Sequence, residues 1–244
     1  MDGNYTKLSY SGEKSTVLYP LEFKVGAEYM QYDAIFDEGV TSFKVDCFIK
    51  QGFLFMENRS FNVRVYAGFL PLRPEVNSTT SNNTSVGNNN INLVFNNDAD
   101  HSFEEYFIGR TETSGLWDNQ VLVRDGGFKL ANTNAGNLGQ TDLGAFSVNI
   151  DTHIPIKAVP RVVRLYFDYG SYYISRSASG GEWENIASGG VMLNVLDFFN
   201  VYVPVWSSES ILINQQNPTF FNQISFTLDM NKLNIIDLYN NFRI

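Results

Sequence analysis

The sequence predicts an all-β protein, an antiparallel up-and-down β-barrel of about eight or more strands. Apolar and polar residues alternate with a period of two in most parts of the 244-residue chain. Aromatic residues make up 15% of it and charged residues only 18%, which is below the usual quarter. No helical periodicity of comparable length is present. We therefore expect one β-domain over residues 1–244.

The alternating segments follow one another along the whole chain. Side chains of a strand point alternately to opposite faces, so each segment has one apolar and one more polar face. Two short connections, Glu57-Asn58-Arg59 and residues 155–160, have the composition of hairpin turns. The segments predicted to be strands are 21–29, 43–50, 61–69, 146–151, 163–170, 191–195, 199–205 and 224–230.

Residues 72–140 break this pattern and are predicted to form a long loop. Residues 77–90 are almost entirely Asn, Ser, Thr and Gly, and a connection of this length is either functional or disordered. Some pattern returns in 101–110 and 120–130. We expect those parts to extend strands or to fold over the mouth of the barrel, with 110–130 as the plug or cover.

Alternation by itself leaves two architectures open. A soluble β-sandwich or jelly roll, acting as a binding or coat protein, has its apolar faces inside. A transmembrane barrel has them toward lipid. The length of segments 21–29 and 61–69 and the aromatic residues near segment ends favour the barrel.

Three strings resemble the C-terminal barrel-like region of M1-type metallopeptidases (gluzincins) from Bacteroidetes. They are FNVRVYAGFL at 61–70, GGVMLNVLDFFNVYVPV at 189–205 and ISFTLDMNKLN at 224–234. The likeness covers most of residues 40–240. It implies an outer-membrane barrel with a structural, anchoring or loop-presenting role. In that family a zinc peptidase domain precedes the barrel, so the resemblance implies that this chain is a fragment or mature segment, the membrane part of a larger peptidase-like protein.

No catalytic residue, metal site or cofactor is predicted for this chain. The sequence contains no His-Glu-x-x-His and no Gly-x-Ser-x-Gly motif. His101 lies in a polar stretch and His153 at the end of a predicted strand, so both are expected to be structural. The chain by itself is therefore not expected to be an enzyme.

The polar faces are predicted to form a structural charge network in the barrel lumen, where opposite charges must pair. A bulge is expected to bring Asp168 into phase. A net charge of −9 with 17 Lys and Arg argues against nucleic-acid binding. The expected partners are outer-membrane lipid and, through residues 72–140, other envelope proteins. The predicted network consists of Glu22, Lys24, Glu28, Lys44, Asp46, Lys50, Arg64, Arg164 and Asp168.

Overall fold

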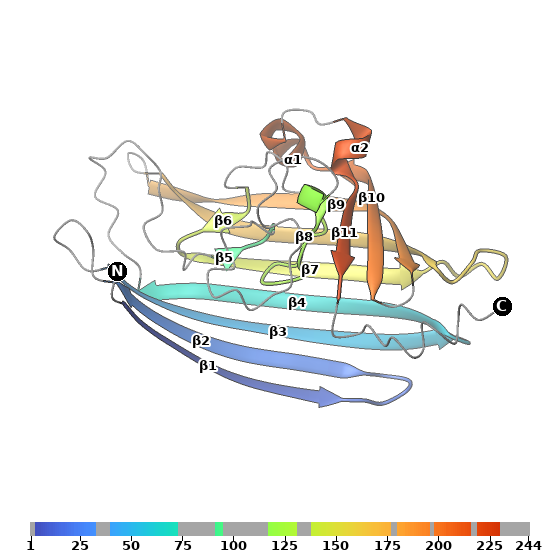
Figure 1. Cartoon of the computed structure of the whole chain (residues 1–244), viewed down its shortest axis with the longest axis horizontal. Helices are drawn as coiled ribbons and strands as arrows, with labels where there is room; N and C mark the ends of the chain where they lie inside the picture. The colour runs from blue at the N-terminus through green and yellow to red at the C-terminus, as the bar shows by residue number, and fades with distance from the viewer. Residues whose placement is uncertain are drawn as a thin grey trace.

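One antiparallel sheet of nine strands dominates the structure and curves into a trough (Figure 1). The computed structural model describes residues 3–32, 40–72, 91–94, 117–130, 138–176, 180–195, 198–215 and 219–229. The strands lie in the order β1-β2-β3-β4-β7-β8-β9-β10-β11, which confirms the all-β class. They are β1 (Gly3–Lys14), β2 (Leu21–Tyr32), β3 (Val40–Met56), β4 (Arg59–Leu72), β7 (Gly144–His153), β8 (Val163–Arg176), β9 (Gly180–Val195), β10 (Phe199–Ser207) and β11 (Ser225–Leu228).

Each of the eight predicted segments overlaps one of these strands, but two features were missed. β1 was not predicted because its apolar face carries only Leu8 and Tyr10 among polar residues and a glycine. β9 begins eleven residues before its predicted segment, at Gly180 rather than at Val191, because glycines interrupt the apolar face of its first half. Alternation is a weak signal wherever small residues stand at face positions.

The β1–β2, β3–β4 and β7–β8 turns lie at the same end of the sheet. Asn58, at a φ of 53°, makes the tight turn between β3 and β4, and residues 154–162 join β7 to β8. Both predicted turns are thus confirmed. The buried guanidinium of Arg59 donates to the carbonyls of Ile154 and, at 2.9 Å, Val159, which fixes the second turn against the first. The two longest connections, 73–143 and 208–224, start from the opposite end.

The predicted closure into a barrel is not seen among the described residues. The sheet ends at β1 on one side and at the four-residue β11 on the other, and no register joins these two edges. Nine strands in a single curved layer are what the structure establishes.

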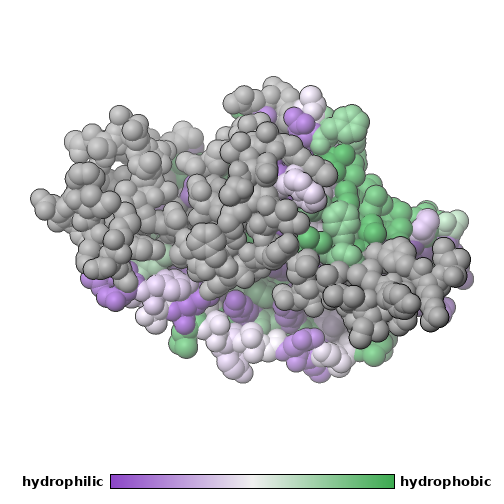
Figure 2. Space-filling model, viewed as in Figure 1, coloured by the Kyte–Doolittle hydropathy of each residue, from purple (hydrophilic) through white to green (hydrophobic). Residues whose placement is uncertain are grey.

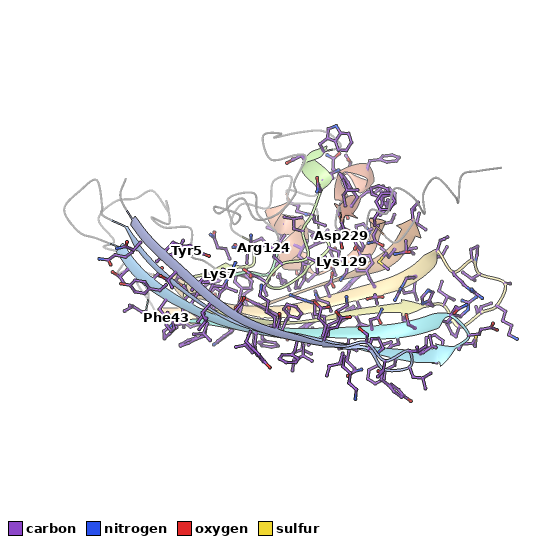
Figure 3. The ribbon with its side chains drawn as sticks, turned by 60° about the horizontal axis from the view of Figure 1, so that its bottom comes forward. Tyr5, Lys7, Phe43, Arg124, Lys129 and Asp229 are labelled. Carbon is purple, nitrogen blue, oxygen red and sulfur yellow. The ribbon has the colours of Figure 1, made fainter. Side chains whose placement is uncertain are left out.

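The two faces of the sheet differ sharply in chemistry. The convex face carries apolar side chains that are exposed along every long strand, including Val25, Val45, Val65 and Phe167. The concave face carries most of the buried residues, charged ones included. Figure 3 shows Phe43 on the convex side, whereas Lys7, Arg124 and Lys129 lie on the other. In the view of Figure 2, hydrophobic residues gather over β10 and β11.

The small elements lie on the concave side of the sheet (Figure 1). They are β5 (Ile91–Asn92), which pairs with β6 (Gln140–Thr141), the 3-10 helix η3 (Trp117–Asn119), and the short helices α1 (Glu209–Asn214) and α2 (Phe220–Gln223). The core cluster joins β5, the segment around Phe128 and α1 to the sheet, whereas α2 has no buried residue. Its members include Tyr66, Leu70, Ile91, Leu93, Phe128, Leu130, Tyr172, Ile186 and Ile211. The described parts of the predicted 72–140 loop are therefore buried structure, because their apolar side chains supply much of this core.

Candidate functional site

Residues 117–130, which we call the strap, cross the concave face of the sheet (Figure 3). Two side chains of β7 hold their backbone. The Ser147 hydroxyl donates to the Gly126 carbonyl at 2.7 Å, and Nδ2 of Asn149 donates to the Gly127 carbonyl at 3.3 Å. Residues 120–130 thus fold over the sheet, whereas the predicted barrel mouth is not seen among the described residues, and residues 101–116 lie outside them. The alternative, that this segment extends a strand, is wrong for the described residues.

A tight turn brings the strap down onto the sheet. The Gly127 N–H donates to the Arg124 carbonyl at 2.7 Å, and both Asp125 and Gly127 have positive φ, 34° and 68°. A Cβ atom on Gly126 would lie 2.3 Å from Cα of Leu93. Only glycine permits this backbone approach, so the Gly-Gly pair is required by packing as well as by the turn.

Asp125 anchors this turn to β3. Nζ of Lys44 contacts both carboxylate oxygens of Asp125, at 3.2 and 3.3 Å, and lies 3.9 Å from Asp46. The backbone N–H of Asn92 is a second donor to Asp125, at 3.3 Å. Lys44 and Asp125 are both largely withdrawn from solvent. The pair therefore ties three separate segments together at one point.

Asp168 forms the second anchor, on β8. Its Oδ1 accepts from Nζ of Lys129 at 2.5 Å and from Nδ2 of Asn149 at 3.0 Å, and its Oδ2 accepts from the Lys129 backbone N–H at 3.0 Å. Asn149 in turn accepts from Nη1 of Arg64 at 3.1 Å. Asp168 is fully buried. The chain of charged and amide groups satisfies a carboxylate that is otherwise costly to bury.

Apolar side chains of the strap fill the space between these anchors. Val121 and Phe128 are fully buried and Leu130 nearly so. A Cβ atom on Gly170 would lie 2.9 Å from the Phe128 ring, so the glycine makes room for that ring on the floor of the trough. The strap is thus packed as a core element as well as pinned by charge.

The predicted charge network lies on one face of the sheet, as expected. A single row of register partners crosses five strands, from Glu22 through Lys50, Arg64 and Asn149 to Asp168. The pairing of β8 with both neighbours has no register shift. The expected bulge at Asp168 is therefore wrong, because regular pairing already places Asp168 on the same face as the other charged residues.

The structure divides the predicted residues into a buried and an exposed group. Four of them are buried: Glu28, Lys44, Arg64 and Asp168. Two more, Asp46 and Arg164, are partly buried. Glu28 pairs with Lys7 at 3.3 Å, and Arg164 contacts Asp151. Glu22 and Lys50, 3.8 Å apart, are about half exposed, and Lys24 is partly buried. The most buried charges of the network therefore lie under the strap, and the charges nearest the hairpin end are the most exposed.

Sequence reasoning missed the strap's own anchors, Asp125 and Lys129. Asp125 precedes two glycines, a sign of a turn but not of where that turn docks. Lys129 is one cation in a stretch with no strand alternation. Their partners lie 81 and 39 residues away in the chain, and no local pattern encodes such a pairing.

The chemistry of the described residues offers no catalytic constellation. His153, the last residue of β7, accepts from the Ser60 backbone N–H at 3.0 Å through Nδ1 and so has a structural role. His101 lies outside the described residues. Within the described ranges no group of three or more His, Cys, Asp or Glu side chains is placed to hold a metal ion. No helix in those ranges is long and apolar enough to cross a membrane.

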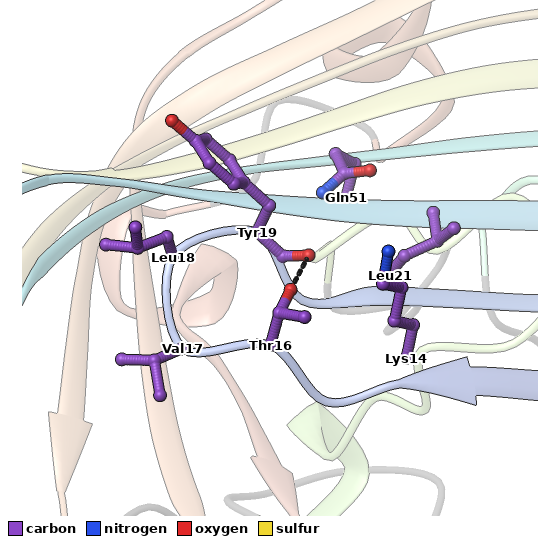
Figure 4. A pocket seen from close by; sticks show the side chains of 7 residues that line it. All are labelled: Lys14, Thr16, Val17, Leu18, Tyr19, Leu21 and Gln51. Carbon is purple, nitrogen blue, oxygen red and sulfur yellow. Dashed lines mark hydrogen bonds between the residues drawn. The ribbon is translucent and has the colours of Figure 1, made fainter.

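A shallow pocket lies beside the turn between β1 and β2, far from the strap (Figure 4). The Thr16 hydroxyl donates to the Tyr19 carbonyl at 2.6 Å and closes this turn. Lys14 is the single charged residue of the lining, and the lining contains no carboxylate and no histidine. The lining residues are Lys14, Thr16, Val17, Leu18, Tyr19, Leu21 and Gln51. We assign this pocket no chemistry.

Comparison with known proteins identifies no relative of this chain. No protein-family model matches it, and searches of curated proteins and of solved structures give no match either.

Acidification is expected to weaken the strap through Asp125. Burial by itself raises the pKa of the Asp125 carboxyl, but Lys44, Arg124 and the Asn92 N–H outweigh it and leave the pKa below its ordinary value. The carboxylate therefore contributes stability above about pH 4, and this contribution is lost as the pH falls through the lower pKa of the folded state. We expect Asp125→Asn to lower the free energy of unfolding by about 2 kcal/mol at pH 7.

Urea unfolding of the wild type and of Asp125→Asn between pH 7 and pH 3 measures this effect. The gap in unfolding free energy between the two proteins should narrow as the pH falls. A constant gap over that range contradicts the assignment.

Proposed function

We propose that this chain forms the wall of an outer-membrane β-barrel and serves as a membrane anchor whose interior is filled by its own strap. One observation carries the proposal. In the part of the chain that the structure describes, the apolar face of the sheet is the uncovered one, and the face with the buried charges is covered. Water-soluble sheets place these faces the other way round, whereas membrane barrels are apolar outside and polar inside.

The aromatic residues support the same orientation. Near the hairpin end, the rings of Tyr19 and Phe53 lie 6.1 Å apart and both are exposed. Near the opposite end, Tyr173 and the exposed Trp183 lie 5.8 Å apart. Aromatic residues at both ends of an apolar band are typical of the two interfaces of a bilayer.

The filled trough favours anchoring over transport. Phe128 and Leu130 of the strap are buried in the core, and Asp125 and Lys129 pair with the sheet. A solute pathway along the concave face would have to displace all of these contacts.

The soluble β-sandwich or jelly roll remains the rival from a different class. It requires a second layer against the apolar face of the sheet. The described residues place the strap, β5 and β6 on the other face, so the observed packing weighs against it.

The proposed partner of the convex face is outer-membrane lipid. A bacterial outer membrane and a peptidase-like parent protein, with no chemistry supplied by these residues, stay predictions from the sequence resemblance to M1-type metallopeptidases of Bacteroidetes. Contacts of residues 72–140 with other envelope proteins stay a prediction.

Cell fractionation tests the proposal. The chain, exported to the periplasm of a Gram-negative host, should appear in the outer-membrane fraction, require detergent for extraction and migrate differently on gels before and after boiling. Recovery as a monodisperse protein without detergent would overturn the membrane proposal and favour the sandwich.

A further inference from the structure

A groove crosses the convex face over β7 to β10, on the side of the sheet opposite the strap. Its volume is about 520 Å³, within the range of about 300–1,000 Å³ that is usual for small-molecule sites. Two neighbouring rows of register partners line it. They include Ile150, Phe167, Gly189 and Trp206 in the first row and Thr152 and Leu165 in the second.

Two features of the backbone hollow this groove. Gly189 leaves no side chain between the rings of Phe167 and Trp206, whose planes are 12° apart and whose centroids are 6.5 Å apart. The register shift after Pro204 places Trp206, and not Val205, opposite Gly189. A bulge of this kind re-aims a side chain, so the Trp206 ring becomes a wall of the groove.

The groove offers hydrocarbon contacts and no free backbone groups. Leu165 is 43% exposed and Trp206 55%, so the groove is open, and its described lining carries no charged side chain. The strands beneath it are paired with one another in register. An extended polypeptide segment in the groove would bury amide groups that find no partner, which is costly. An acyl chain has no such groups and therefore fits this surface better.

A basic turn adjoins the groove. The second row of the groove lies next to the last residue pair before the turn 154–162, which contains Lys157 and Arg161 and no acidic residue. Both cations are exposed, and no ion pair joins either of them to a carboxylate of the described residues. Ile156 and Val162 of the same turn are exposed as well. Basic and apolar side chains together are typical of the boundary between headgroups and acyl chains.

We propose that the groove is a binding site for an anionic phospholipid. One acyl chain crosses Gly189 between the rings of Phe167 and Trp206, and the phosphate binds Lys157 and Arg161 through charge-assisted hydrogen bonds. The two cations select this lipid over a zwitterionic one, because a zwitterionic headgroup carries a cation of its own.

This inference rests on the proposed function, since the convex face meets lipid only in a membrane. The short turns of outer-membrane barrels lie on the periplasmic side. The site therefore faces the inner leaflet.

Quenching of tryptophan fluorescence by lipids with brominated acyl chains tests the site, because Trp206 lies in its wall. The full chain in a non-ionic detergent is titrated with brominated phosphatidylglycerol and, separately, with brominated phosphatidylcholine of the same acyl chains. We expect saturable quenching and an affinity about tenfold higher for phosphatidylglycerol. Glycerol 3-phosphate, which has the phosphate but no acyl chain, is expected not to displace the lipid at equal concentration.

Two pairs of variants locate the acyl chain and the headgroup. Trp206→Phe should remove the saturable quenching, whereas Trp183→Phe should keep it, because Trp183 is an equally exposed tryptophan outside the lining. Lys157→Gln combined with Arg161→Gln should bring the two affinities within about twofold of each other. Lys14→Gln combined with Lys50→Gln removes the same charge from β1 and β3 and should keep the preference.

Equal affinity of the wild type for the two lipids, or saturable quenching that survives in Trp206→Phe, overturns the proposal. So does a preference unchanged by the loss of Lys157 and Arg161. Absence of saturable quenching in the wild type also overturns it, because the groove is then filled by the chain itself or holds no lipid. The assay requires no membrane insertion, so its failure beside a successful fractionation leaves the proposed function standing.

Discussion

Replacing Asp168 with alanine is expected to lower the free energy of unfolding by about 3–5 kcal/mol, the largest effect of any single substitution considered for this chain. Asp168 is fully buried and accepts hydrogen bonds from Lys129 and Asn149. Alanine leaves the Lys129 ammonium in the core without its counter-charge. The strap should then detach from β8.

Urea unfolding followed by tryptophan fluorescence measures this change, with Glu22→Ala as the control. Glu22 lies in the same row of register partners as Asp168, but it is half exposed and pairs with Lys50 at 3.8 Å. An exposed pair of this kind contributes at most about 1 kcal/mol. Equal losses for the two variants would show that the buried anchor does not hold the strap.

Val65→Arg is expected to cost about 2–4 kcal/mol when the protein unfolds from phospholipid vesicles. Val65 lies on β4 in the convex face and is 46% exposed, between Ile49 and Val148 of the neighbouring strands. In hydrocarbon the arginine must be desolvated or must distort the bilayer. In water the same exposed position tolerates a charge within about 0.5 kcal/mol. The substitution therefore distinguishes a lipid-facing from a solvent-facing convex surface.

Val17→Arg provides the matched control for this experiment. Val17 is 86% exposed in the turn that joins β1 to β2, where a charge costs about 0–1 kcal/mol even in a bilayer. A near-neutral Val65→Arg in vesicles would contradict the proposed membrane wall. Arg64→Leu does not separate the two architectures, because Arg64 is buried beneath the strap and its loss disturbs Asn149 in either medium.

Most of the sheet could be predicted because strand alternation is a local signal. In β4, residues 61–69 alternate without interruption, and a single face assignment places Arg64 with the polar set and Val65 with the apolar set. β1 was beyond reach because Leu8 and Tyr10 are the only large apolar residues on their face, so its pairing with β2 depends on the hairpin and not on its own pattern.

The candidate site was predicted only in part. The concave charges follow from strand phase, so Lys44, Arg64 and Asp168 could be placed on one face from the sequence. The strap's contribution could not, because Asp125 and Lys129 lie in a segment without periodicity and their partners are distant in the chain. Gly126 and Gly170 leave room for Leu93 and for the Phe128 ring, respectively. This reason for the glycines is visible only when the positions of Leu93 and Phe128 are known.

By itself, the sequence determined the all-β class, the phase of most strands and the sharing of one face by the charged residues, because a period of two needs only neighbouring residues. Only the tertiary structure decided which face is covered. The alternation of a strand does not say which of its two faces points inward. The strap answers this, because it packs on the polar face. Buried pairing of Asp125 with Lys44 and of Lys129 with Asp168 holds the strap on the polar face, and this leaves the apolar face outward.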